Sequence, residues 1–315
     1  MSKTSAVSLS LKGDLLTGVE WSATQVQDFL HLAADVKAHP GRYQGTLDGK
    51  SLVLIFEKPS LRTRVTFEVA IAQLGGFSTF LDHTSSRLGE REPVRDIARN
   101  LERWVQGIIA RVFAQKTLDD LAKNATVPVI NALSDKYHPC QAFADFFTLE
   151  ERFGGLRGLK FTYVGDGNNM CHSLLMAGAQ TGAHVRVATP EGYEPDPSIV
   201  SHAKRIGELT GGSVEILTSP EAAVNGAQAV YTDVWASMGQ ESEAATREAV
   251  FAPYQVNSAL FGLAAADAVF LHCLPAHRGL EVTDAVMDSP RSVVYDQAEN
   301  RLHVQKAILH SLLNA

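Results

Sequence analysis

Residues 51–64 read SLVLIFEKPSLRTR, and this stretch decides the fold. After Ser51, residues 52–56 form a continuous apolar run, which predicts a strand at 51–56 that is buried on both faces. The run then turns polar and enters a helix-like segment, Ser60 to Leu74, which ends at Gly75-Gly76. A buried strand that leads directly into a helix indicates a parallel α/β sheet.

The same alternation continues along the chain. Further strands are predicted at 78–81, 107–112, 128–131, 160–164, 184–188, 214–217, 229–232, 268–272 and 292–295. Further helices are predicted at 93–105, 138–153, 169–181, 197–209 and 299–313. We therefore predict an α/β protein with doubly wound parallel sheets. A length of 315 residues suits about two domains, and residues 154–158, GGLRG, are the expected break.

Composition excludes several classes of protein. Lys plus Arg is 28 and Asp plus Glu is 35, so the net charge of −7 disfavours a nucleic-acid or membrane-surface partner. The three cysteines lack C-x-x-C spacing, which disfavours a zinc clip or disulfide framework and fits free thiols in the cytoplasm. No secretory signal and no membrane-length apolar run is predicted.

The strongest chemical signal is the helix start at residues 60–64. The first N–H groups of a helix have no intrahelical partner and attract anions. Ser60 and Thr63 add hydroxyl groups, and Arg62 adds a guanidinium that binds phosphate oxygens bidentately. This pattern predicts a phosphate site, and the alternative is a capped, solvated helix start.

Other strand ends carry weaker signals. Arg111 follows an apolar strand, where a surface salt bridge is the alternative role. His138 and Gln141 share a predicted first helical turn, where they suit a carbonyl oxygen and an amide, or simply cap the helix. Residues 164–169, VGDGNN, resemble a dinucleotide loop, but Met170 occupies the third glycine position, so a nicotinamide cofactor is poorly supported.

Two later loops complete the set. Asp233, together with the Ser237 loop, suits an amino group, although a turn with a capping Asp is an equal alternative. Cys273 follows a buried strand at a predicted crevice mouth, and a core cysteine is the alternative. His272 precedes Cys273, and adjacent strand residues face opposite sides, so a Cys–His nucleophile pair is disfavoured.

These segments, in the order FEKPSLRTR, HPCQ, DGNN, DVWASMG, HCLPAHRG and ENR, closely resemble the ornithine carbamoyltransferase family. The resemblance runs from about Leu11 to Leu313. It implies a carbamoyl-phosphate domain at 1–150, joined by the returning C-terminal helix 297–315, and an ornithine domain at 151–296. It also implies a homotrimer with active sites at subunit boundaries.

The resemblance also implies the roles of individual residues. The implied carbamoyl-phosphate residues are Ser60, Leu61, Arg62, Thr63, Arg87, Arg111, His138, Gln141, Cys273, Leu274 and Arg301. The implied ornithine residues are Asn169, Asp233, Ser237 and Met238. Of all these, Arg111, His138 and Cys273 are expected to act in catalysis.

The chain departs from the family pattern at two positions. Leu61 stands where Thr or Gly is common, so that position is expected to contribute only its backbone. Arg87 stands where Gln or His is common, and the implied role of that position is to reach a neighbouring subunit's phosphate site.

The predicted reaction transfers the carbamoyl group of carbamoyl phosphate to the δ-amine of L-ornithine, giving L-citrulline and phosphate in arginine metabolism. No metal or organic cofactor is expected. The nearest alternative is a carbamoyltransferase for putrescine or an N-acylornithine. A non-catalytic paralogue would be expected to lack Arg62, Arg111, His138 or Cys273, and all four are present.

Overall fold

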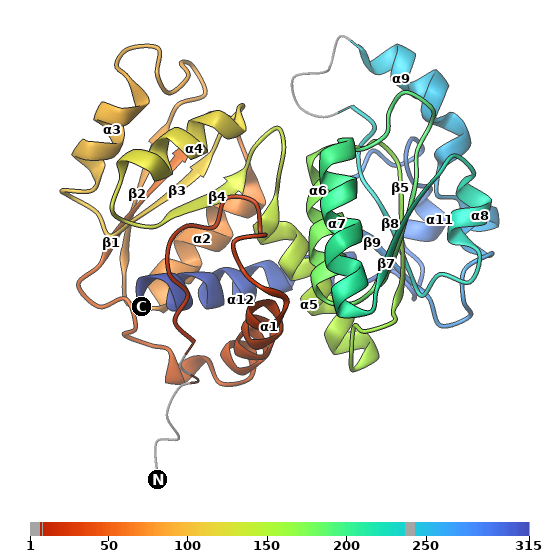
Figure 1. Cartoon of the computed structure of the whole chain (residues 1–315), viewed down its shortest axis with the longest axis horizontal. Coiled ribbons are helices and arrows are strands. Elements are labelled where there is room, and N and C mark those ends of the chain that lie inside the picture. The colour runs from red at the N-terminus through yellow and green to blue at the C-terminus, as the bar shows by residue number, and fades with distance from the viewer. Residues whose placement is uncertain (1–6, 8, 237–242, 315) are drawn as a thin grey trace. The chain divides into compact units, whose positions relative to one another are not determined.

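The computed structural model describes residues 7, 9–236 and 243–314 of the chain. It divides into two compact units (Figure 1). Unit 1 comprises Met1–Phe147 and Glu299–Ala315, and unit 2 comprises Thr148–Ala298. The chain leaves unit 1 within helix α5 (Pro139–Phe153) and re-enters it within α12 (Val294–Leu313).

Unit 1 is built on a four-stranded parallel sheet of order β2-β1-β3-β4. Its strands are β1 (Ser51–Phe56), β2 (Phe77–Asp82), β3 (Gly107–Arg111) and β4 (Val129–Leu133). The chain moves from β1 to β2 in one direction across the sheet, and β3 and β4 lie on the other side of β1. The strand order therefore reverses between β1 and β3, and ligands of such sheets bind beyond the carboxyl ends of strands at that switch point.

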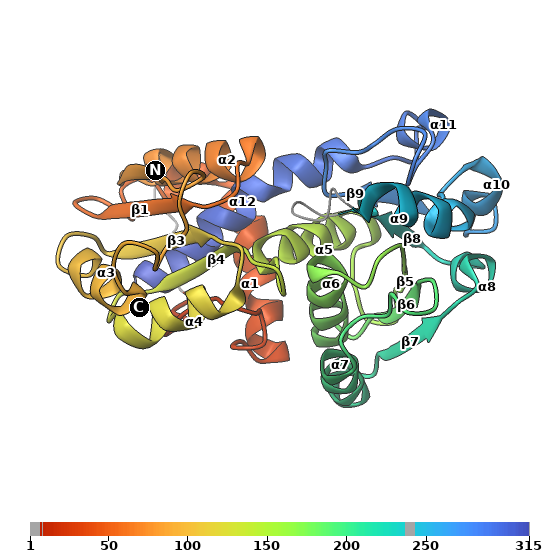
Figure 2. The same cartoon turned by 90° about the horizontal axis from the view of Figure 1, so that it is seen from above.

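Helices cover both faces of this sheet. They are α1 (Ala23–Ala38), the short η1 (Pro40–Arg42), α2 (Leu61–Gln73), α3 (Val94–Leu101), α4 (Gln115–Asn124) and the unit 1 part of α12. Right-handed crossovers with this strand order place α2 on one face and α3 and α4 on the other, as Figures 1 and 2 show. Val53 and Ile55 of β1 pack in one buried cluster with Leu118 of α4, because alternate strand residues share a face.

Unit 2 repeats the plan with a five-stranded parallel sheet of order β7-β6-β5-β8-β9. Its strands are β5 (Lys160–Val164), β6 (His184–Ala188), β7 (Ser213–Leu217), β8 (Ala229–Thr232) and β9 (Val269–His272). Its switch point lies between β5 and β8. Its remaining elements are α6 (Asn169–Gln180), α7 (Pro197–Thr210), α8 (Pro220–Val224), α9 (Ala244–Phe251), η3 (Ala252–Tyr254), α10 (Ser258–Phe261) and α11 (Asp284–Met287).

The predicted fold class, two doubly wound parallel-sheet units with a C-terminal helix that returns to the first, is confirmed. Strands β1, β5, β6 and β8 begin and end at the predicted residues, and the other strands of the two sheets shift by one or two. Helices α1, α4 and α8 to α11 were not predicted. No helix in the described part of the chain is long and apolar enough to span a membrane.

The predicted strand at 292–295 is wrong. Its apolar, β-branched run forms one isolated bridge, between Ser292 and Phe270 of β9. Two backbone hydrogen bonds flank the bridge, from Phe270 N–H to the Arg291 carbonyl and from Val293 N–H to the Phe270 carbonyl. Helix α12 begins at Val294 and ends the pairing, and Asp296 in its first turn suits the positive end of the helix dipole.

Candidate active site

In unit 1, the start of α2 follows β1 at the switch point. Ser60 has an extended backbone, and its hydroxyl accepts a hydrogen bond from Thr63 N–H over 3.3 Å, which makes it the N-cap. The side chain of Leu61 is 75% exposed, so at this position the helix start offers its backbone N–H. Because the dipole of α2 favours negative charge here, this end of the helix suits a phosphate.

Arg301 joins three helices of unit 1 beneath that helix start. Its guanidinium, on α12, donates to the Thr63 hydroxyl of α2 over 3.1 Å and to the Gln141 carboxamide oxygen of α5. The Gln141 amide in turn donates to a carboxylate oxygen of Asp145 over 2.7 Å. All four side chains are buried, so these hydrogen bonds fix three predicted site residues, Thr63, Gln141 and Arg301, relative to one another.

His138 lies in the same buried, cationic environment. Burial lowers the pKa of His138 well below its usual value, and the nearby positive charges of Arg301 and Arg111 lower it further. The imidazole is therefore neutral and keeps one N–H for donation. Arg111 is buried at the end of β3, the other strand of the switch point. Together, His138, Arg111 and Arg301 suit a polarised carbonyl oxygen that gains negative charge.

Glu57 anchors the loop that carries Arg87. This buried carboxylate follows β1 and accepts two backbone hydrogen bonds of 2.7 Å, one from Leu88 N–H and one from Phe113 N–H. The Phe113 ring has the Lys58 ammonium and the Arg87 guanidinium each 4.5 Å from its centre. A cation placed over the face of an aromatic ring is attracted to it. Phe113 therefore positions the Arg87 side chain, and Glu57 positions the backbone of the loop.

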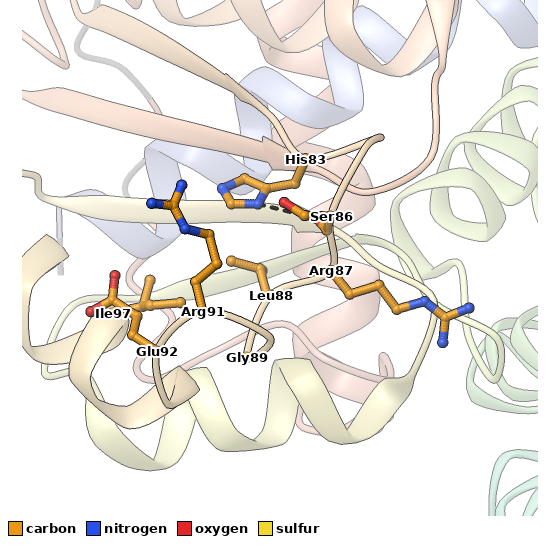
Figure 3. A pocket seen from close by; sticks show the side chains of 8 residues that line it. All are labelled: His83, Ser86, Arg87, Leu88, Gly89, Arg91, Glu92 and Ile97. Atoms are coloured by element: carbon orange, nitrogen blue, oxygen red, sulfur yellow. Dashed lines mark hydrogen bonds between the residues drawn. The ribbon is translucent and has the colours of Figure 1, made fainter.

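The loop also borders a pocket of about 430 Å³ (Figure 3). His83 Nδ1 lies 3.3 Å from the Ser86 carbonyl oxygen and closes the turn. The side chains of Arg87 and Arg91 extend in opposite directions from this loop (Figure 3), and both are exposed. Arg87 is therefore presented on the surface of unit 1 and is held by its backbone neighbours.

In unit 2, the switch point gathers the D-G-N-N turn and Asp233. Asn168 caps α6 by accepting hydrogen bonds from the N–H groups of Met170 and Cys171. Its amide donates to one Asp233 carboxylate oxygen over 3.4 Å, and the Cys273 thiol donates to the other over 3.0 Å. A Cβ at Gly167 would lie 2.2 Å from the Pro195 backbone nitrogen, so only glycine fits this turn.

A buried His–Glu pair shapes the loop after β9. His272 Nδ1 accepts a hydrogen bond from Leu274 N–H over 2.9 Å, so the ring proton is on Nε2, which lies 3.2 Å from a Glu281 oxygen. The same Glu281 oxygen accepts from His277 N–H. Leu274 has a φ of 59°, an uncommon backbone conformation for leucine. The His272–Glu281 pair thus holds the loop of Cys273 and Leu274 in place, including the positive φ that leucine rarely adopts.

Arg247 of α9 stabilises the turn from the other side. Its guanidinium donates over 3.0 Å to both Asp166 and the Trp235 carbonyl oxygen. Burial raises the pKa of Asp166 to about 6, since it outweighs the attraction of Arg247 and is reinforced by the negative charge of Asp233. This ion pair links the D-G-N-N turn to the segment that follows Asp233.

One cluster in the described residues has metal-like spacing. Asp233, His272 and Cys273 offer ligand atoms within 4.8 Å of one another. Both His272 ring nitrogens already make hydrogen bonds, and the Cys273 thiol already donates to Asp233. The cluster is therefore a hydrogen-bonded network.

The structure places the predicted residues in two groups. Those in unit 1 are Ser60, Leu61, Arg62, Thr63, Arg87, Arg111, His138, Gln141 and Arg301. Those in unit 2 are Asn169, Asp233, Cys273 and Leu274, whereas Ser237 and Met238 lie outside the described residues. Sequence reasoning missed the buried residues that position these groups, namely Glu57, Asp145, Asp166, Arg247 and Glu281. Glu57 had a signal, because it directly follows a buried strand.

Comparisons with known proteins identify the family of the chain. Residues 13–151 match the family domain described as "Aspartate/ornithine carbamoyltransferase, carbamoyl-P binding domain". Residues 157–312 match "Aspartate/ornithine carbamoyltransferase, Asp/Orn binding domain". The chain belongs to the aspartate/ornithine carbamoyltransferase family, and the predicted enzyme class, a carbamoyltransferase, is confirmed.

Several of its relatives are named ornithine carbamoyltransferase. The enzyme of that name from Pyrococcus horikoshii is 53% identical over 308 residues, which cover 97% of each chain. The solved structure from Pyrococcus furiosus has a TM-score of 0.94 and 51% identity, covering 98% of this chain and 99% of that one. The structure from Thermus thermophilus has a TM-score of 0.87 and 49% identity, covering 96% of this chain and 100% of that one.

Proposed function

We propose that the chain transfers the carbamoyl group of carbamoyl phosphate to the δ-amine of L-ornithine and releases L-citrulline and phosphate. The observation that carries this proposal is the buried set around Arg301, whose guanidinium hydrogen-bonds Thr63 at a phosphate-type helix start and Gln141, and which together with Arg111 lies near the neutral His138. The relatives' names support ornithine as the acceptor.

The first domain, residues 1–150 with the C-terminal helix 297–315, binds carbamoyl phosphate in this proposal. The phosphate lies at the start of α2, where Ser60, Arg62 and Thr63 donate from side chains and Leu61 donates from its backbone. Arg301 supports this set through Thr63. A guanidinium and several N–H groups directed at one anion suit phosphate recognition.

The carbamoyl group lies beside Arg111, His138 and Gln141. Negative charge grows on its carbonyl oxygen as the amine attacks, so preorganised donors stabilise the transition state more than the substrate. A neutral His138 donates one N–H without adding a third charge to this buried region. Cys273 and Leu274 are the proposed contacts of the carbamoyl amide.

The second domain, residues 151–296, binds ornithine through Asn169, Asp233, Ser237 and Met238. An amine of this type has a pKa of about 10.4, so the ammonium form first releases one proton to solvent and the neutral amine then attacks. Asp233, which already accepts hydrogen bonds from Asn168 and Cys273, orients the amine. The amine nitrogen bonds the carbonyl carbon, the carbon–oxygen bond to phosphate breaks, and phosphate leaves with a proton. The proposal needs no metal or organic cofactor.

The remaining predictions concern the assembly and its setting. We propose a homotrimer in which Arg87, exposed on its anchored loop, reaches a neighbouring subunit's phosphate site. We propose a cytoplasmic enzyme because its three cysteines are free. Arginine synthesis is the proposed pathway, and the Pyrococcus furiosus relative is named anabolic. The alternative acceptors, putrescine and N-acylornithine, are not favoured by the relatives' names.

Two measurements test the proposal. Citrulline formation is measured with ornithine, while putrescine and N-acetylornithine are supplied in parallel, and only ornithine is expected to react rapidly. Turnover of another amine alone would overturn the ornithine assignment. Arg62→Ala is expected to weaken carbamoyl-phosphate saturation severely, and an unchanged saturation curve would remove Arg62 from the phosphate site.

A further inference from the structure

A second pocket in unit 1 contains none of the predicted site residues. It has a volume of about 420 Å³, within the ~300–1,000 Å³ range of small-molecule sites. It lies where the end of α2 and the η1 turn meet one face of α12. Its lining residues are Pro40, Gln44, Gln73, Leu302, His303 and Lys306.

Lys306 is the unusual member of this lining. Its side chain is only 4% exposed, and it has no hydrogen-bond or ion-pair partner within residues 7, 9–236 and 243–314. Burial alone lowers its pKa. Because Lys306 lines the pocket, its stem is buried and its ammonium faces the pocket, and a largely enclosed charge without a partner is costly, which is why such charges are normally paired. The nearby Lys37 differs, because it donates to the Asn300 side chain over 2.8 Å.

The surroundings of Lys306 do not supply the missing negative charge. Burial and the positive charges of Lys37 and Lys306 lower the pKa of His303, while its contact with Glu299 opposes them. Glu299 Oε1 lies 3.4 Å from His303 Nε2, and the Glu299 side chain is 59% exposed. Within the described residues, Glu299 therefore contacts His303 and not Lys306, and no carboxylate pairs with the Lys306 ammonium.

We propose that this pocket binds a small monocarboxylate. Its carboxylate pairs with the Lys306 ammonium, and its apolar body lies against Pro40 and Leu302. One uncompensated buried charge matches a single negative charge better than a phosphate dianion. The side-chain amides of Gln44 and Gln73 supply further donors for the second carboxylate oxygen.

Thermal unfolding in the presence of sodium butyrate tests this proposal, with sodium chloride keeping the ionic strength constant. Butyrate at about ten times its dissociation constant should raise the Tm of the wild-type protein by about 2 °C. Lys306→Met should abolish the shift, whereas Lys123→Met, which removes an exposed lysine on α4, should retain it. An equal shift in Lys306→Met and wild type would overturn the proposal.

A second arm uses the wild-type protein alone, so it does not depend on the folding of a variant. n-Butyramide has nearly the same shape as butyrate but no charge, and it should give no shift. Inorganic phosphate should give no shift that depends on Lys306. An equal effect of butyramide would show that charge is irrelevant, and a larger Lys306-dependent effect of phosphate would replace the carboxylate assignment. Citrulline formation by Lys306→Met shows that the variant is intact.

Discussion

Replacing Arg301 with lysine tests the buried network that organises unit 1. Arginine donates to Thr63 and Gln141 at once, because its guanidinium is a planar fork. Lysine keeps the charge but presents a compact ammonium, so it can satisfy only one of these two partners well. Hydrogen bonds to a charged group contribute about 1.5–3 kcal/mol each.

The expected loss is therefore about 1.5–3 kcal/mol in the free energy of unfolding, measured by urea denaturation. Because Thr63 and Gln141 are both proposed carbamoyl-phosphate contacts, the KM for carbamoyl phosphate should rise roughly 10- to 100-fold. Steady-state citrulline formation measures that change. The ornithine KM, which depends on unit 2, should change much less.

Arg99→Lys is the matched control, because Arg99 is exposed on α3. It should change the free energy of unfolding by less than about 0.5 kcal/mol and the KM for carbamoyl phosphate by less than about twofold. A carbamoyl-phosphate KM within about twofold of wild type in Arg301→Lys would refute the reasoning that this network positions the substrate contacts. Stability loss with unchanged KM would leave Arg301 a purely structural role.

Three further substitutions probe other parts of the account. Asp166 has a folded pKa of about 6 and an ordinary value of 3.8, so its contribution to stability is present below pH 4 and is lost as pH rises through 6. In wild type the free energy of unfolding should therefore fall by up to about 3 kcal/mol as pH rises from 4 to above 6, and urea denaturation should show that Asp166→Asn lacks this fall. The same pH dependence in wild type and Asp166→Asn would contradict the prediction. Glu57→Gln leaves one oxygen to accept from the two N–H groups of Leu88 and Phe113, so it should lower the free energy of unfolding by about 1–3 kcal/mol. Glu92→Gln, at an exposed position, is the control. Equal stability of the two variants would contradict the anchoring role of Glu57. Ser60→Ala removes the cap of α2 and should cost about 1 kcal/mol with a higher carbamoyl-phosphate KM, whereas an unchanged KM would exclude a phosphate contact by that hydroxyl.

The strands and the helix starts at the two switch points could be predicted from the sequence. A continuous apolar run such as residues 52–56 has few alternatives to a buried strand when a capped helix follows it closely. Residues 292–295 show where this reasoning fails. They carry the same apolar, β-branched signal, but α12 begins at Val294 and leaves only one bridge to β9.

The positioning residues could not be predicted in the same way. Glu281 matters because it lies beside His272, and Arg247 because it pairs with Asp166, 81 positions away in the sequence. Such partners are set by tertiary packing, which local patterns do not encode. The conformation of Leu274 is similar, because nothing about a leucine predicts a positive φ.

The most direct test of the central claim follows the bond that forms. The enzyme is supplied with carbamoyl phosphate labelled with ¹³C at its carbonyl carbon and with ornithine labelled with ¹⁵N at its δ-amine. The account predicts a product whose ¹³C resonance is split by a one-bond coupling to ¹⁵N, with one phosphate released per product. A labelled product without that coupling would contradict transfer to the δ-amine. Phosphate release without any labelled product would contradict carbamoyl transfer to ornithine.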